Sequence, residues 1–188
     1  LELPTDYLRP AVQSLRGGRD LLKLTPELME RVKTLSHACG TTDFMTSLAV
    51  FGVLLSRMTG EEDLMIGCPI ANRNRHEIEH LIGCFINTLV MRIDLSGNPT
   101  FLELLEQVKQ TALDGFAQQD LPFEKLVEAL QPTRNMSHAP LFQVMFVLQN
   151  APMRKLQLPD LTVTPLEIEN VMAKFDLRLA MEETEQVV

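Results

Sequence analysis

The chain has 188 residues, of which 45% are hydrophobic, and a formal net charge of −8 at neutral pH. This length predicts one domain, or one lobe of a larger domain, whose core needs no disulfide or metal ion for stability. The acidic balance and the dispersed basic residues argue against a nucleic-acid-binding surface.

The sequence also argues against secretion and against a membrane span. Residues 1–7 have no charged segment followed by an apolar core, so they do not resemble a signal peptide. The longest apolar run, residues 44–55, is shorter than the roughly 20 residues that cross a bilayer, and it predicts a buried helix instead. The three cysteines show no metal-like spacing, which favours reduced thiols in a cytoplasmic protein: Cys39, Cys68 and Cys84.

The first predicted elements are a connector and two helices. Residues 1–24 contain prolines and glycines and no helical period, which predicts an extended connector that leads into a domain over residues 25–188. Thr25-Pro26-Glu27 supplies a helix N-cap, a proline in the first turn and an acid near the N-terminus, and Gly40 ends the helix. A second helix, residues 43–58, is apolar nearly all round and is expected to be buried on every side.

Strands then alternate with further helices. Strands are predicted at residues 64–70, 89–95, 141–148, 161–168 and 175–181, and the third of these is apolar enough for a central position. The capping box Thr100-x-x-Glu103 opens a helix that runs to residue 116, and a shorter helix covers residues 122–130. This interleaving predicts an α/β (α+β) sandwich with a mixed sheet and helices packed on it.

Three blocks interrupt the apolar pattern with polar residues: Ile82–Arg92, Gln119–Glu124 and Pro140–Asn150. If the polar side chains in these blocks are buried, they need hydrogen-bond partners. In order, the blocks resemble the fifth, sixth and seventh motifs of nonribosomal peptide synthetase condensation domains. Three further segments are similar to the same family and extend the resemblance over nearly the whole chain: residues 1–10, which resemble the segment between the two lobes, residues 63–73 and residues 174–177.

The resemblance is to the C-terminal lobe, a half-domain similar to chloramphenicol acetyltransferase. It implies a domain that forms peptide bonds between acyl or peptidyl and aminoacyl thioesters, both carried on phosphopantetheine, in a tunnel between two lobes. The family signature His-His-x-x-x-Asp-Gly belongs to the other lobe, and no two histidines here are neighbours. The isolated chain is therefore expected to be inactive and to bind no cofactor. Ile86–Leu89 looks like the peptide-bond-forming branch rather than an epimerization domain, and a heterocyclizing relative stays possible.

The resemblance implies partners and a location as well. The expected partners are the N-terminal lobe of the same domain, upstream and downstream peptidyl carrier domains and an adjacent adenylation domain, in the cytoplasm. No nucleic acid or membrane is expected as a partner. Without its other lobe, the chain should expose an apolar face and self-associate.

Five residues are predicted to line the substrate tunnel: Asn87, Thr88, Arg92, Gln143 and Gln149. An amide donates and accepts, so Asn87 could orient a thioester carbonyl or an oxyanion, or it could instead cap a bend before a strand. Arg92 could meet a substrate or form a salt bridge. Gln143 and Gln149, six residues apart, should share one face of a strand, at the lobe interface or in the core.

The remaining motif residues are interpreted as structural: Arg73 as a partner that stabilises the fold, and Asp120, Pro122, Phe123 and Glu124 at the start of a helix, where acids are favoured.

Two alternatives stay open. His76-Glu77-x-x-His80 matches a zinc metallopeptidase pattern, with Glu103 as a distant third ligand. The stretch between Pro69 and Gly83 has room for barely two helical turns, so no metal is expected. The second alternative is a non-catalytic interaction module.

Overall fold

The computed structural model describes residues 1–133, 135–149, 161, 163 and 172–183. Its elements, in chain order, are α1 (Pro26–Ala38), α2 (Asp43–Thr59), β1 (Asp63–Ile70), α3 (His76–Glu79), β2 (Asn87–Asp94), α4 (Phe101–Ala117), α5 (Phe123–Leu130), β3 (Val144–Gln149) and β4 (Leu177–Glu182).

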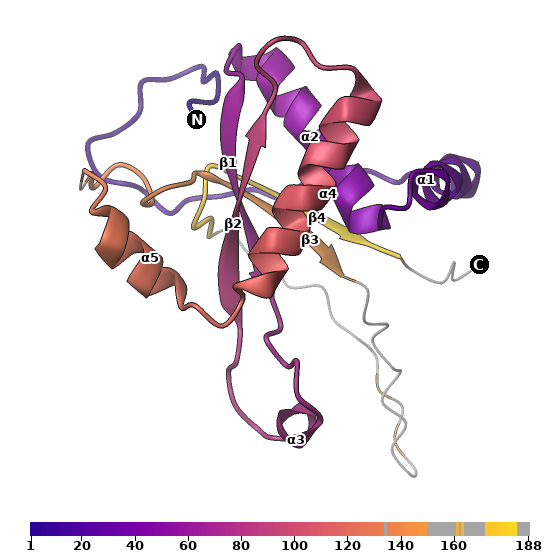
Figure 1. The fold of residues 1–188 in the computed structure, drawn as a ribbon. Helices are drawn as coiled ribbons and strands as arrows, with labels where there is room; N and C mark the ends of the chain where they lie inside the picture. Colours follow the sequence, from indigo (N-terminus) through magenta and orange to yellow (C-terminus); the bar gives the residue numbers. More distant parts are fainter. Residues whose placement is uncertain (134, 150–160, 162, 164–171, 184–188) are drawn as a thin grey trace.

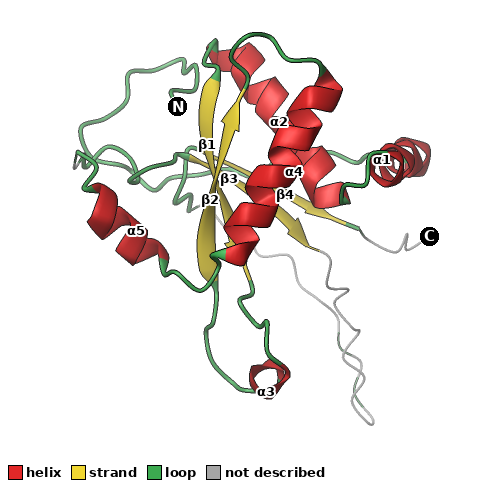
Figure 2. Cartoon of the chain, in the orientation of Figure 1, coloured by secondary structure: helices red, strands yellow, loops and turns green. Residues whose placement is uncertain are grey.

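The strands form one mixed sheet in the order β2-β1-β3-β4. β1 pairs antiparallel with β2 through the full length of both strands, whereas β3 runs parallel to β1 and to β4. Figure 2 shows the sheet in yellow, with helices α2 and α4 lying together over one of its faces. The predicted mixed sheet with packed helices is therefore confirmed.

The core lies between this sheet face and the helices. On β2, Leu89, Met91 and Ile93 are buried, while Arg92 and Asp94 between and beyond them are exposed. This alternation is the one predicted for a half-buried strand. The facing strands contribute Leu64, Ile66, Val144 and Phe146, and the Phe146 ring packs against Phe44 and Phe51 of α2.

Two helix starts follow the predicted capping, and a third helix has a cap of the same kind. The Thr25 and Thr42 side chains accept hydrogen bonds from the backbone N–H groups of Leu28 and Met45, which begins α1 and α2. Thr100 and Glu103 form a complete capping box at the start of α4. The starts of α1 and α4 were predicted from their caps because capping is a local interaction, whereas the start of α2 was predicted from its apolar run.

The structure differs from two expectations, and a third lies largely outside the described residues. α2 is not buried on every side, because Val50, Leu54 and Met58, four residues apart in turn, are about half exposed along one face. The strand predicted from residue 141 begins at Val144, after a positive φ of 67° at Leu141. The strand predicted over residues 161–168 lies largely outside the described residues.

Residues 1–24 contain no helix and no strand, only an isolated bridge between Arg16 and Met172. Leu1 and Leu3 nevertheless pack against the core. In the described part of the chain, no single helix is long and apolar enough to cross a membrane. The pair α1 and α2 passes that test only together, and the two helices are bent by 107° relative to each other.

Candidate functional site

An open hollow of about 340 Å³ lies where β1 ends and β2 begins. It joins the first two of the three polar blocks, because residues of both lie on its wall. Its lining residues are Asn72, Cys84, Phe85, Ile86, Asn87, Thr88, Asp120, Pro122, Phe123 and Glu124.

Asn87 connects the two blocks. Its Nδ2 donates to the backbone carbonyl oxygens of Gln119 (2.9 Å) and Leu121 (2.8 Å). Its Oδ1 accepts from the backbone N–H groups of Thr88 (2.9 Å) and Phe123 (3.1 Å), the latter being the first residue of α5. A primary amide has two N–H donors and two acceptor lone pairs, so all four positions are used within the fold. The predicted contact with a substrate carbonyl stays a prediction, and it would require one of these bonds to break.

Two polar groups of residues that line the same hollow, on Thr88 and Asn72, lack a hydrogen-bond partner among the described residues. Within the described residues, the Thr88 hydroxyl forms no hydrogen bond, although its backbone N–H bonds to Asn87. The Asn72 Oδ1 atom is buried and finds no donor among the described residues. Asn72 has a positive φ of 51°, a conformation that asparagine tolerates better than most residues. The sequence did not indicate that Asn72 lines this hollow, because an asparagine that follows a strand is ordinarily assigned to a turn.

The Gln119–Glu124 block forms the entry to α5. The Asp120 carboxylate accepts from Asn74 Nδ2 (3.2 Å), Pro122 is the N-cap, and Glu124 lies in the first turn. The Phe123 ring packs 5.6 Å from Phe142, between ring centres. The block thus holds α5 against the rest of the fold.

The two glutamines of the third block are separated by the structure. Gln143 precedes β3 and is buried, with Nε2 donating to the carbonyl of Ala139 (3.1 Å) and Oε1 accepting from the nitrogen of Leu1 (3.4 Å). Gln149 is the exposed last residue of β3. The expectation that a single strand carries both was wrong, because regular pairing begins only at Val144.

Arg92 lies near the C-terminal end of β2 and forms a salt bridge with Asp63. Its Nε and Nη2 donate to the two carboxylate oxygens of Asp63 on β1, both at 2.9 Å. The hydrogen bond from Arg92 lowers the pKa of Asp63 below its ordinary value. Arg92 also lines a second hollow, of about 350 Å³, between β2 and α4. It does not share the hollow of Asn87 and Thr88.

Arg73 braces the long loop between β1 and β2. Its Nη1 donates to the carbonyl oxygens of Ile78 (2.5 Å), Glu79 (3.2 Å) and Leu81 (2.9 Å), and its Nη2 to that of Gly83 (3.1 Å). The guanidinium carbon lies 4.4 Å from the centre of the Phe85 ring. These contacts are those of a residue that stabilises the fold.

The His76–His80 segment does not have the form of a peptidase centre. α3 contains only four residues, and both histidines are exposed. Glu103 is used elsewhere: its carboxylate accepts from the backbone N–H and the hydroxyl of Thr100, both at 2.8 Å. These two bonds, the backbone one first, lower the pKa of Glu103.

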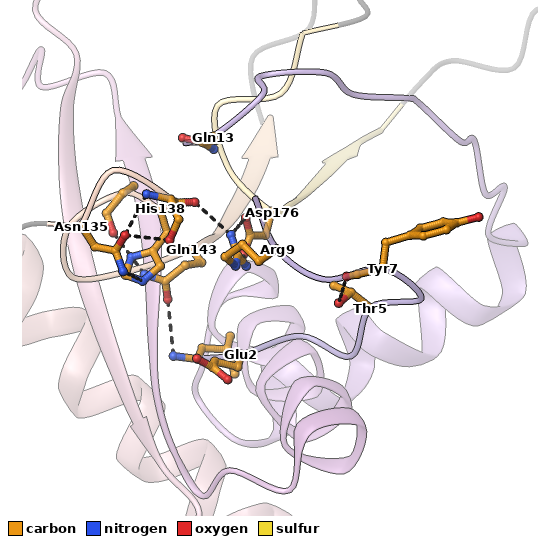
Figure 3. Close-up of polar contacts among 12 residues, drawn as sticks. Glu2, Thr5, Tyr7, Arg9, Gln13, Asn135, His138, Gln143 and Asp176 are labelled. Carbon is orange, nitrogen blue, oxygen red and sulfur yellow. Dashed lines mark hydrogen bonds and ion pairs between the residues drawn. The ribbon is translucent and has the colours of Figure 1, made fainter. Parts of the chain in front are cut away.

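The N-terminal segment contacts Gln143 of the third block and residues on either side of that block in the sequence (Figure 3). Arg9 forms a bidentate salt bridge with Asp176, next to the start of β4, and donates to the carbonyl of Ser137 at 3.1 Å. Gln13 donates through Nε2 to the carbonyl of Lys174 (3.0 Å). Residues 1–13 therefore link Ser137, in the segment before β3, to the residues that lead into β4.

Comparison with known families identifies the fold. The chain matches the family model Condensation domain over residues 1–187. It is 54% identical to a linear gramicidin synthase of Brevibacillus parabrevis over 181 residues, which cover 95% of this chain and 2% of that protein. It is 51% identical to malpinin synthetase of Mortierella alpina, over 96% of this chain and 2% of that protein. The chain thus spans a small part of these relatives.

Solved structures of known proteins have the same fold as this chain. The X-domain from teicoplanin biosynthesis aligns with a TM-score of 0.87 and 29% identity, over 99% of this chain and 42% of that one. The X-domain in its complex with OxyB gives a TM-score of 0.84 and 30% identity, over 99% of this chain and 40% of that one. A four-domain nonribosomal peptide synthetase bound to AMP and glycine shares the fold at 24% identity and a TM-score of 0.84, over 98% of this chain and 15% of that one. The chain belongs to the condensation-domain family of nonribosomal peptide synthetases.

Proposed function

We propose that this chain is the C-terminal lobe of a condensation domain that joins an acyl or peptidyl thioester to the amine of an aminoacyl thioester. The observation that carries the proposal is the coverage: 99% of this chain aligns with only 42% of the teicoplanin X-domain. The rest of such a domain is long enough for a second lobe. Because His-His-x-x-x-Asp-Gly is absent from the 188 residues, that lobe supplies the catalytic histidine.

In this proposal the chain forms one wall of the substrate channel and part of the carrier-docking surface. The hollow at the start of β2 supports the first role, since the Thr88 hydroxyl that lines it forms no hydrogen bond among the described residues. Asn87 holds this wall in shape through its four hydrogen bonds. The substrates arrive on phosphopantetheine arms of upstream and downstream carrier domains, beside an adenylation domain, in the cytoplasm.

The loop around α3 supports contact with a second lobe. It extends away from the sheet beyond the ends of β1 and β2 (Figure 1). Its apolar side chains Leu81, Ile82 and Ile86 are exposed, Ile82 completely. Exposed apolar side chains grouped in one segment are typical of a surface that another protein segment covers.

A chimera tests the proposal. This chain would replace the matching 181 residues of the linear gramicidin synthase to which it is 54% identical. We expect the chimera to form peptide bonds between the carrier-bound substrates of that module, as measured by mass spectrometry of the downstream carrier. A folded chimera that binds both carriers but forms no product would contradict the proposal.

A non-catalytic docking module is the second candidate, and one observation favours it. The X-domain that resembles this chain at 30% identity was solved in a complex with OxyB, another protein. A folded but inactive chimera that still binds carrier domains would support docking as the function of the chain.

A further inference from the structure

The loop between β1 and β2 brings three metal-ligating side chains together. Ligand atoms of His76, Glu79 and His80 all lie within 4.8 Å of one another, and all three residues are exposed. His80 follows α3 with φ −94° and ψ −2°, so it continues the right-handed turn. The two imidazoles, four residues apart, therefore lie over the same side of this turn, with their ring centres 5.8 Å apart.

The distances suit a small ion with imidazole and carboxylate ligands. His76 Nδ1 and Glu79 Oε2 are 3.2 Å apart and form a hydrogen-bonded ion pair, which a bound ion would replace. Two ligands that each lie about 2.1 Å from a tetrahedral ion are separated by roughly 3.4 Å, so this pair needs almost no adjustment. His80 can approach the same point by rotating its exposed side chain.

The backbone under these ligands is held in place before any ion binds. Arg73 bonds to the carbonyl oxygens of Ile78 and Glu79 within the turn and to those of Leu81 and Gly83 beyond it. The Phe85 ring in turn supports the guanidinium. Because the loop is already ordered, ion binding loses less conformational entropy than it would on a free peptide.

We propose that His76, Glu79 and His80 form a binding site for a divalent transition metal of the zinc class. Two imidazoles and one carboxylate favour Zn²⁺, Co²⁺, Ni²⁺ or Cu²⁺ over Mg²⁺ and Ca²⁺, which prefer oxygen ligands alone. The carboxylate ligand is Glu79, whereas in the His-Glu-x-x-His pattern Glu77 would be the general base and not a ligand. The site departs from the expectation of no metal, and it is a binding site only. Three protein ligands would leave one position of a four-coordinate ion for water or for a side chain of a bound protein.

Metal titration of the untagged full chain tests this site. Co²⁺ is added to chelator-treated protein and followed by its visible absorption, and Zn²⁺ affinity is measured by competition with a chromogenic indicator. We expect one ion per chain. Since loss of even a residue that only orients a metal ligand weakens metal binding about 10- to 100-fold, His80→Gln and Glu79→Gln should each weaken it at least about tenfold.

Three control substitutions test whether other residues of the chain bind the metal ion. His138→Gln removes a histidine outside the loop, Glu77→Gln removes the neighbouring carboxylate, and Cys84→Ser removes the exposed thiol. All three should leave the affinity unchanged. The proposal is overturned if no ion binds at one equivalent, if Glu77→Gln weakens binding as much as Glu79→Gln, or if Cys84→Ser abolishes it. Circular dichroism of each variant confirms that the fold is retained.

Discussion

The Asn87 amide joins the first residue of β2 to the segment that leads into α5. Its two N–H groups bond to the carbonyl oxygens of Gln119 and Leu121, and its oxygen accepts from Phe123 as well as Thr88. No other residue type of the same size both donates twice and accepts twice. The side chain is therefore required for its hydrogen-bonding groups rather than for its volume.

Replacing Asn87 by Asp should destabilise the chain while Thr88→Val should not. A carboxylate cannot donate, so the carbonyls of Gln119 and Leu121 would lose their partner, at a cost of about 1–3 kcal/mol. The Thr88 hydroxyl forms no hydrogen bond in the described residues, so Thr88→Val should change the free energy of unfolding by less than about 0.5 kcal/mol. Urea denaturation checks both variants. Equal stability of Asn87→Asp and the wild type would contradict the structural role.

The cysteines differ in their surroundings and should differ in reactivity. Burial raises the pKa of the Cys68 thiol to about 12, while Cys84 is exposed. Only the thiolate reacts, so at neutral pH an alkylating reagent should label Cys84 rapidly and Cys68 only after unfolding. Peptide mass spectrometry gives the two rates, and Cys84→Ser should remove the fast one. Labelling of Cys68 in the native protein at the rate of Cys84 would show that β1 is not packed as described.

At the scale of the elements, β1 and the segment before β3 meet without space for a side chain. A Cβ atom on Gly67 would lie 2.2 Å from the Phe142 ring. That ring is buried and stacks on Phe175, with ring centres 5.3 Å apart, so it has little room to move. The strand and the aromatic cluster therefore depend on a glycine at this position.

Gly67→Ala should lower the free energy of unfolding by about 1–3 kcal/mol, the usual cost of overpacking. Gly18→Ala is the matched control, because no atom lies within 4 Å of its would-be Cβ. The control should be neutral or slightly stabilising, since alanine restricts the unfolded chain. Thermal denaturation of the two variants decides the matter, and similar melting temperatures for both would contradict the packing.

Local interactions made much of the fold predictable. Capping by Thr25 and Thr100 and the alternation along β2 depend on neighbours within a few residues, and those elements appear where expected. The exposed face of α2 was missed because composition does not reveal which apolar face a helix leaves uncovered. The bonds of Asn87 to the entry of α5 join residues far apart in sequence, so no local pattern could reveal that the amide is fully used.

At the scale of the whole molecule, exposed apolar side chains are grouped in at least two places among the described residues. One is the α2 face formed by Val50, Leu54 and Met58, and another is the loop between α3 and β2, with Leu81 and Ile82. Isolated exposed apolar residues are common, but grouped ones are typical of a surface that a partner covers. The proposed second lobe would be such a partner.

Without that partner, the isolated chain should self-associate. Light scattering coupled to size-exclusion chromatography should give an apparent mass that rises with protein concentration above the 21.2 kDa of the monomer. Ile82→Lys adds a charge to a fully exposed side chain and should reduce the association without altering the melting temperature. A mass that stays monomeric at every concentration would count against an uncovered interface.

The most direct test of the central claim is a peptide-bond assay with the lobes kept as separate proteins. The chain is mixed with both carrier proteins, each bearing its thioester substrate, with and without the lobe that carries His-His-x-x-x-Asp-Gly. The mass of the downstream carrier and its attached group is then measured by mass spectrometry. We expect dipeptide on that carrier only when the second lobe is present, because that lobe supplies the catalytic histidine. Dipeptide formed by the chain alone would contradict the proposal that the catalytic residue lies in the other lobe.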